Sequence, residues 1–198
     1  MSSRAGISET VAQAKLSIVN LVATAELDQS VNLEHLVNVH GFLYDYEIYH
    51  CAYLKDRRTK GKVSIFSSGK MICIGAKSLE AAKHDLNYAA KRLAELGLIS
   101  RTRIRAKLQN IVATADLGKS LDLESIASKL PHAIYEPEQF PGAVYWAPEL
   151  DGAAMLLFPT GKIVVAGVKR QELLPVAEKL LEDLISRTQE PDGRKGYA

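Results

Sequence analysis

The sequence has few cysteines, little net charge and no long apolar run, and each absence excludes a class of protein. The two cysteines, Cys51 and Cys73, lie at unrelated places, which argues against a disulfide or zinc site and for reduced, buried thiols. A formal net charge of +2 is too small by itself to indicate a nucleic-acid-binding protein. The longest apolar runs, such as 153–158, are too short to span a membrane, and the N-terminus lacks a signal-peptide pattern. We therefore expect an intracellular protein with no membrane partner.

Patterns typical of catalysis and metal binding are also scarce. Five histidines show neither metal-ligand spacing nor an acid–base partner: His35, His40, His50, His84 and His132. We expect no enzyme activity, no metal and no other cofactor. With 198 residues, 47% of them hydrophobic and 24% charged, the composition is that of a globular protein of one or two domains.

The sequence does contain an internal repeat. Residues 19–25 (VNLVATA) return as residues 109–115 (QNIVATA). Each copy continues with a leucine-spaced segment (31–36, 121–126), a tyrosine–acid segment (44–47, 135–138) and a Gly-Lys turn (69–70, 161–162). Four landmarks in the same order predict two fused halves that share one sheet. We expect an N-terminal segment at 1–14, repeats at 15–99 and 100–187, and a tail at 188–198.

Hydrophobic alternation predicts the elements of each repeat. Long strands are expected at 16–26 and 104–115, and a short helix at 33–39. Further strands are expected near 43–46, 50–55, 62–67 and 70–76, then near 132–136, 142–146, 153–158 and 162–168. Each copy closes with a long amphipathic helix, the first capped by Ser78 and stopped by Gly97. The fold class is α+β: one curved antiparallel sheet of about ten strands, with two helices per repeat on one face.

The other face of this sheet has nothing left in the chain to cover it. Alternation places on it an apolar set: Val22, Phe66, Ile72, Ile74, Val112, Phe158 and Val164. Monomers seldom expose such a patch without a binding role. Asn20 and Asn110 lie in mid-strand on the same face, and because asparagine is a poor strand former, they favour a polar ligand there. The sequence therefore predicts a large binding surface.

Basic residues are concentrated in the segment between the repeats, residues 101–107, where four cations alternate with other residues. On a strand they would share one face, which fits a solvated face as well as phosphate contacts. Lys70 and Lys162 follow turn glycines, and for them too a phosphate contact and a solvated turn are equally good interpretations.

Over roughly residues 15–187 the chain resembles the TATA-binding protein family in its archaeal form. Four motifs carry the resemblance: QNIVAT at 109–114, YEPEQFPG at 135–142, IFSSGKM at 65–71 and GAKS at 75–78. The resemblance implies a pseudo-two-fold saddle with helices on its convex face and double-stranded promoter DNA against its concave sheet. It implies a non-enzymatic general initiation factor that binds and bends A·T-rich DNA in the minor groove. It also implies recruitment of transcription factor B, and through it RNA polymerase, in the cytoplasm or nucleoid of a prokaryote or in a nucleus.

The resemblance also implies roles for particular residues. Asn20 and Asn110, flanked by Val22 and Val112, match the saddle centre, and Tyr49, Phe66, Phe140 and Phe158 match four aromatic wedges. The remaining DNA-facing positions are Ile72, Ile74, Leu156, Val164 and Ala166. Glu136 and Glu138 match acidic residues that contact transcription factor B, although they could also be simple solvated charges.

Several positions depart from the family pattern. Tyr49 replaces a phenylalanine, Ile74 and Ala166 replace threonines near the central base pairs, and Ser64 replaces a leucine. Ile48, Lys55 and Trp146 stand where the family commonly has arginines, and residues 149–152 form an acidic insertion. These departures leave open an alternative: a divergent paralogue that acts mainly as a protein-interaction platform with weak or altered DNA specificity. Because apolar concave faces can pair with each other, a homodimer without DNA is also expected.

Overall fold

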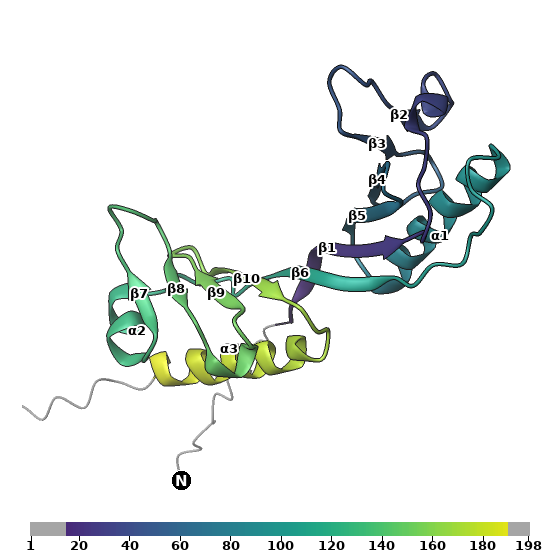
Figure 1. Ribbon diagram of the computed structural model, residues 1–198. Helices are drawn as coiled ribbons and strands as arrows, with labels where there is room; N and C mark the ends of the chain where they lie inside the picture. Colours follow the sequence, from purple (N-terminus) through teal and green to yellow (C-terminus); the bar gives the residue numbers. More distant parts are fainter. Residues whose placement is uncertain (1–14, 190–198) are drawn as a thin grey trace, which may run out of the picture.

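The computed structural model of the chain describes residues 15–189 (Figure 1). The expected N-terminal segment, 1–14, and residues 190–198 of the expected tail lie outside this range. No helix between residues 15 and 189 is long and apolar enough to cross a bilayer.

The two halves of the chain repeat one order of elements. The first half contains β1 (Ser17–Glu26), the 3-10 helix η1 (Leu33–Leu36), β2 (Phe42–Leu43), β3 (Cys51–Leu54), β4 (Lys62–Phe66), β5 (Lys70–Ala76) and α1 (Leu79–Glu95). The second half contains β6 (Lys107–Asp116), α2 (Leu123–Lys129), β7 (Ala133–Tyr135), β8 (Ala143–Tyr145), the 3-10 helix η2 (Pro148–Leu150), β9 (Ala154–Leu157), β10 (Lys162–Val168) and α3 (Leu173–Gln189). Helix α3 extends two residues into the segment expected as a tail.

All ten strands form one antiparallel sheet in the order β2-β3-β4-β5-β1-β6-β10-β9-β8-β7. This order reads the same from either end once each strand is replaced by its repeat equivalent, so a pseudo-two-fold axis passes between β1 and β6. Three register pairs mark the axis: Leu21 with Ile111, Asn20 with Val112, and Val22 with Asn110. The expected sheet of about ten strands is therefore confirmed.

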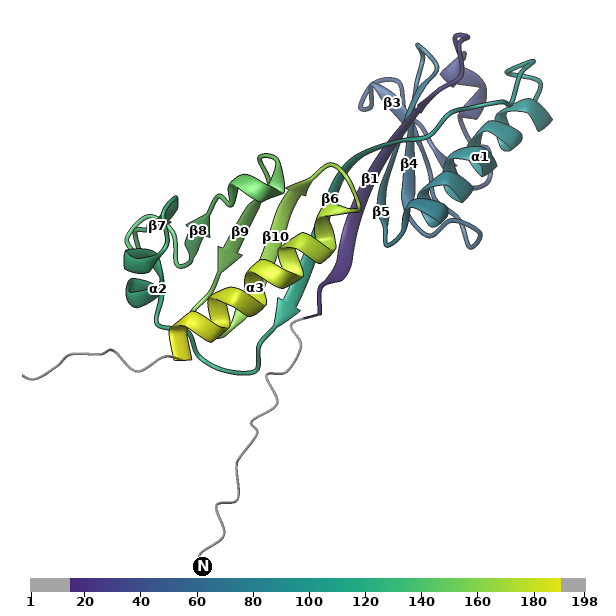
Figure 2. The same ribbon diagram turned by 90° about the horizontal axis from the view of Figure 1, so that it is seen from below.

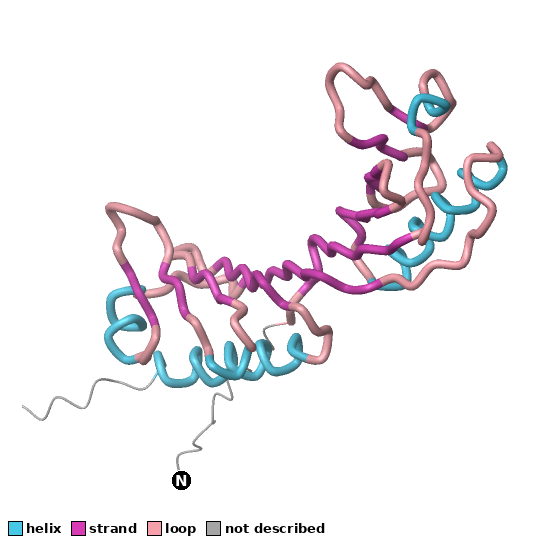
Figure 3. The backbone as a smooth tube through the Cα atoms, viewed as in Figure 1, coloured by secondary structure: helices cyan, strands magenta, loops and turns pink. Residues whose placement is uncertain are grey.

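The sheet is bent into a saddle (Figures 1 and 3). The β1–β6 ladder is interrupted at Val19 and at its repeat equivalent Gln109, where the register shifts by one residue. Such β-bulges increase local twist and bend the strand. Helices α1 and α3 run along the outer side of the two lobes (Figure 2). No helix among residues 15–189 covers the inner side, here called the concave face.

Alternating residues of the strands form the core under the helices. Leu21, Ala23 and Ala25 of β1 are buried, as are Ile111, Ala113 and Ala115 of β6. Helix α1 covers β1, β4 and β5 with one buried stripe: Ala82, Leu86, Ala89, Ala90 and Leu93. Small residues on both elements allow close approach of helix and sheet, and burial of this apolar area is the main stabilising term.

Both expected ends of α1 are confirmed. The Ser78 Oγ accepts a hydrogen bond from the Ala81 N–H at 3.1 Å, which satisfies one of the unpaired donors of the first turn. Gly97 has φ +72°, and the Leu98 N–H donates to the Leu93 carbonyl at 3.0 Å. This is a glycine C-terminal cap, in which the left-handed residue needs no Cβ.

Two expectations about secondary structure were wrong. The basic segment is not a strand before Lys107, because the register of β1 ends with Thr24 opposite Lys107 and leaves residues 104–106 without a strand to pair with. The short helix of the first repeat is a single 3-10 turn rather than a helix over 33–39, so the first repeat contains one α-helix instead of two. Val37 and Val39 are β-branched and disfavour continuation, whereas Ala127 in the second repeat favours it.

Candidate nucleic-acid interface

The thirteen side chains predicted to face DNA are all partly exposed: Asn20, Val22, Tyr49, Phe66, Ile72, Ile74, Asn110, Val112, Phe140, Leu156, Phe158, Val164 and Ala166. Tyr49, Phe140 and Phe158 lie in loops beside the sheet, and the other ten lie in its strands. Cross-strand partners place them on one face, since Val22 lies opposite Ile74 and Val164 lies opposite both Leu156 and Thr114. The result is a continuous apolar strip that crosses both repeats.

Two asparagine amides lie at the centre of this strip in unequal environments. The Asn20 Oδ1 accepts a hydrogen bond from the Gly75 N–H at 2.9 Å, which fixes the amide and leaves its NH₂ group free to donate elsewhere. The Asn110 Oδ1 is enclosed and has no hydrogen-bond partner among residues 15–189. An enclosed, unpaired acceptor costs stability.

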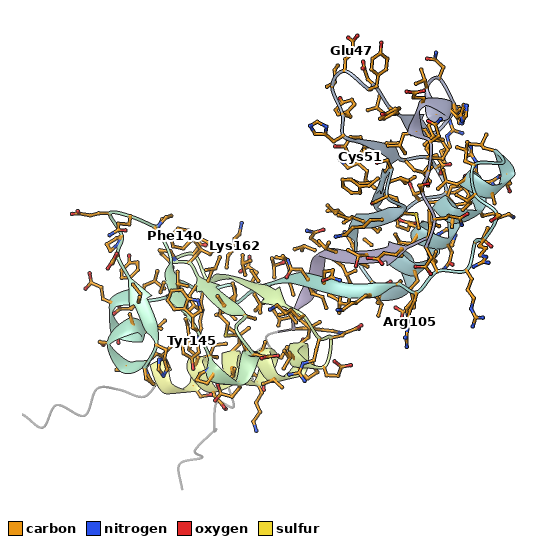
Figure 4. The ribbon with its side chains drawn as sticks, in the orientation of Figure 1. Glu47, Cys51, Arg105, Phe140, Tyr145 and Lys162 are labelled. Carbon is orange, nitrogen blue, oxygen red and sulfur yellow. The ribbon has the colours of Figure 1, made fainter. Side chains whose placement is uncertain are left out.

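The second stirrup loop, residues 136–142 between β7 and β8, holds an aromatic pair. The rings of Phe140 and Phe158 are 5.8 Å apart at an interplanar angle of 63°. A Cβ built on Gly142 would lie 2.8 Å from the Phe140 Cε1 and 3.3 Å from the Phe158 Cδ1. The absence of a side chain at Gly142 therefore lets the two rings meet. Figure 4 shows Phe140 near the upper rim of its lobe.

The first stirrup loop, residues 44–50 between β2 and β3, arranges its aromatic residues differently. Tyr49 contacts Tyr53 edge to face at 5.4 Å, and the Lys62 ammonium lies 4.4 Å from the centre of the Tyr53 ring. A side-chain hydrogen bond with Cys51 raises the pKa of the Tyr53 phenol above its usual value. Tyr53 is an aromatic side chain of the concave face that sequence reasoning missed.

The two ends of the concave face were also missed. Leu43 on β2 and Ile134 on β7 are 56% and 49% exposed, and the ladders place them on the same face as Tyr53 and Val144. Strands β2 and β7 are two and three residues long, too short for alternation to reveal a face. Aligning the two repeats position by position would have been the signal that identified Leu43 and Ile134.

The basic residues form mixed-charge borders rather than a continuous basic stripe. Exposed Lys70 and Lys162 lie opposite Glu26 and Asp116 in the ladders, which favours solvated turns for these lysines. The basic segment borders a hollow of about 980 Å³ lined by Arg103, Arg105 and Lys107 and by the acids Glu26 and Asp28. The Arg105 side chain points away from the concave side (Figure 4). Lys55 donates to the carbonyls of Lys60 and Gly61, which uses two of its three donors.

Acidic residues mark the outer parts of the second repeat. Glu136 and Glu138 are exposed in the second stirrup loop, and the Glu136 carbonyl accepts the Phe140 N–H at 2.9 Å. The expected insertion at 149–152 contains Asp151, whose φ is +51° and which pairs with Arg170 at 3.3 Å. The acidic turn is therefore partly neutralised within the chain.

One cluster has residue types found in enzymes, but its geometry is structural. Asp85 is fully buried, and its carboxylate accepts the N–H groups of Lys60 and Gly61, the latter at 2.6 Å. The Cys73 thiol and the His84 imidazole both contact this carboxylate, at 3.9 and 3.1 Å. Burial, together with the Asp85 charge, raises the pKa of Cys73 to about 12, whereas a nucleophilic cysteine needs a lowered pKa. Asp85 therefore anchors the start of β4 to α1.

Comparison with known proteins identifies the saddle. The model of the family described as transcription factor TFIID, or TATA-binding protein, matches residues 15–96 and 105–186. The chain is 36% identical over 159 residues to a TATA-box-binding protein of Cenarchaeum symbiosum, a match that covers 79% of this chain and 86% of the relative. It is 38% identical over 175 residues to that of Haloarcula marismortui, with 87% and 92% covered.

A solved structure gives the same answer in three dimensions. The structure titled Methanococcus jannaschii TBP superimposes with a TM-score of 0.74 at 34% identity, and the match covers 87% of this chain and 99% of that one. Sequence and fold thus agree over both repeats, and the chain belongs to the TATA-binding protein family, whose members are non-enzymatic DNA-binding transcription factors.

Proposed function

We propose that this initiation factor binds A·T-rich promoter DNA in the minor groove through its concave face, bends it, and recruits transcription factor B. The observation that carries the proposal is the exposed apolar strip with the two amides of Asn20 and Asn110 at its centre. The relatives are named for the TATA box, which fits an A·T-rich site. We take 15–99 and 100–187 as the two saddle repeats that lie on the two halves of the site.

The chemistry of the concave face suits a minor groove. Edges of A·T pairs present only acceptors there, and the amino group of guanine adds a donor. The amide nitrogens of Asn20 and Asn110 can donate to those acceptors, while Val22 and Val112 exclude water beside them. Two donors on the pseudo-two-fold axis read the centre of the site and disfavour a guanine donor at that point.

Bending requires the aromatic residues at the two ends. Apolar side chains inserted between base steps unstack them and bend the duplex toward the major groove, which is the known mode of this family. Phe140 and Phe158 form such a pair in the second stirrup, and Tyr49 and Phe66 are its counterparts in the first. Bending brings more of the duplex into contact with the curved sheet, which offsets the cost of unstacking.

Recruitment of transcription factor B would use the exposed carboxylates of Glu136 and Glu138. They lie in a loop beyond the concave face, so a basic partner could contact them while DNA occupies the saddle. RNA polymerase would follow through that partner, at the nucleoid in a prokaryote or in the nucleus of a eukaryote.

The test is a duplex with a central A·T-rich segment and a fluorescence donor and acceptor at its ends. We expect the protein to increase energy transfer between the ends and to lose affinity steeply as salt rises, because phosphate contacts release counterions. Glu136→Gln/Glu138→Gln should leave this signal unchanged but abolish the additional stabilisation by transcription factor B. Absence of bending with and without transcription factor B would refute the proposal.

A second function, a protein-interaction platform with weak DNA affinity, is favoured by one specific observation. Ile74 is 42% exposed on the concave face, where the family pattern has a threonine, so a polar contact with the bases is replaced by apolar surface. In that case transcription factor B would bind without DNA, and bending would be absent or shallow in its salt dependence. The concave face would then also pair two copies, which sedimentation in the absence of DNA would detect.

A further inference from the structure

The two repeats carry different residues, Cys51 and Gly142, at the position that follows the stirrup aromatic by two residues. Ala52 lies opposite Ile65 in the first repeat, and Ala143 lies opposite Leu157 in the second, so these two alanines are equivalent. The residues just before them are Cys51 and Gly142. At the junction of the stirrup loop and the next strand, the first repeat therefore has a cysteine where the second has a glycine.

Gly142 has a visible steric role. A Cβ there would meet the Phe140 ring at 2.8 Å, closer than real Cβ contacts, and the Leu157 carbonyl at 3.0 Å, which is unusually tight. The Phe140 ring thus occupies the volume that any side chain at this position would fill. Contact between Phe140 and Phe158 at 5.8 Å depends on that volume being free.

Cys51 places a side chain at the equivalent position, the first residue of β3. It is only 6% exposed and lies opposite Phe66 in the ladder. The ring of Tyr49, the equivalent of Phe140, contacts Tyr53 instead. Figure 4 shows Cys51 on the inner side of its lobe. The aromatic pair of the second stirrup is assembled before DNA arrives, whereas the loop residue Tyr49 contacts Tyr53 of the adjoining strand β3.

We propose that Cys51 is a positioning residue whose Cβ turns Tyr49 away from Phe66, so that the first stirrup opens its base step less effectively than the second. This inference rests on the proposed DNA-binding function. The Phe140–Phe158 pair then supplies most of the wedge, and the two ends of the bound duplex are unstacked unequally. Because the effect is steric, it comes from the Cβ rather than from the thiol.

The experiment measures affinity and end-to-end energy transfer for the A·T-rich duplex with four variants of the full chain. Cys51→Gly should increase both, with affinity rising about 5-fold or more, since aromatic–base stacking is worth roughly 1–3 kcal/mol per base. Cys51→Ala keeps the Cβ and should behave like the unmodified protein. Tyr49→Ala should cost little alone but should remove the whole gain in the Cys51→Gly background. This coupling would not arise from a purely structural role.

The second stirrup provides the reciprocal variant, which keeps the test decisive if Cys51→Gly folds poorly. Gly142→Ala should displace Phe140 and reduce bending about as much as Phe140→Ala does. Equal bending by unmodified, Cys51→Gly and Gly142→Ala proteins would overturn the inference while leaving the proposed function intact. An equal gain from Cys51→Ala would also overturn it, because it would assign the effect to the thiol. Failure of every protein to bind the duplex would instead refute the proposed function.

Discussion

The two central asparagines are sequence equivalents with opposite expected effects on stability. Asn20→Ala removes the 2.9 Å hydrogen bond from the Gly75 N–H, which lies at an exposed site. A hydrogen bond of this kind contributes about 0.5–1.5 kcal/mol to the free energy of unfolding. Asn110→Ala removes an enclosed oxygen that has no partner among residues 15–189, and leaving such a group unpaired costs about 1–3 kcal/mol. Asn110→Ala should therefore be neutral or stabilising.

The difference is large enough to measure. In a domain of this size, each kcal/mol shifts Tm by roughly 2–4 °C, so Asn110→Ala should melt several degrees above Asn20→Ala. Thermal and urea unfolding of the free proteins gives this order. Titration of the A·T-rich duplex at fixed salt should show both variants weakened, by about 3- to 10-fold each, since each loses one donor to the bases. Asn110 would then be a residue kept for its ligand at a cost to the fold.

A specific result would refute this reasoning. If Asn110→Ala destabilises the free protein as much as Asn20→Ala, the Asn110 amide has a structural partner and its enclosed oxygen is not a cost. Asn110→Asp provides the matched control, because it keeps the shape but places a charge on the enclosed oxygen. It should be the least stable of the three variants.

Three further predictions concern the scaffold. Partial burial alone would raise the pKa of Asp56, but hydrogen bonds from the Tyr88 hydroxyl and neighbouring backbone N–H groups, with the nearby guanidinium of Arg92, lower it below the ordinary 3.8. The stabilising contribution of Asp56 should therefore be present above about pH 4 and be lost as pH falls through the folded pKa. Asp56→Asn should flatten acid unfolding curves in that window. Asp85→Ala should cost about 3–5 kcal/mol in urea unfolding, because it leaves buried backbone donors unpaired. Gly161→Ala, whose Cβ would lie 2.0 Å from a carbonyl, should lower Tm far more than Gly118→Ala, which has a positive φ but nothing within 4 Å; equal losses would assign the whole cost to φ.

Local periodicity was a reliable guide wherever a segment was long and paired on both sides. Strands β1, β5 and β10 lie close to their expected bounds, because alternation over seven or more residues leaves one consistent face, and helix α1 lies between its expected cap and stop residues. It failed for residues 104–106, which were expected to begin β6, since a strand needs a neighbouring strand to supply its hydrogen bonds.

The candidate site was predictable to the level of the face but not of the individual side chain. Ten of the thirteen expected positions lie in strands of the concave face and three lie in loops beside it, and their contacts with DNA remain predictions. Tyr53 and Leu43 were missed because short strands carry little periodic signal. Asp85 was missed because its partners, Lys60 and Gly61, are about 25 residues away and contribute backbone groups that have no sequence signature.

The sequence by itself determined the duplicated halves, the antiparallel strands and the uncovered apolar face, because these follow from repetition and from a side-chain period of two. Only the tertiary structure decided where the symmetry fails. Asn20 has a backbone partner and Asn110 has none, and Cys51 places a side chain at the position where Gly142 leaves volume to Phe140. Such differences depend on cross-strand register and on distances of a few tenths of an ångström between groups far apart in the chain.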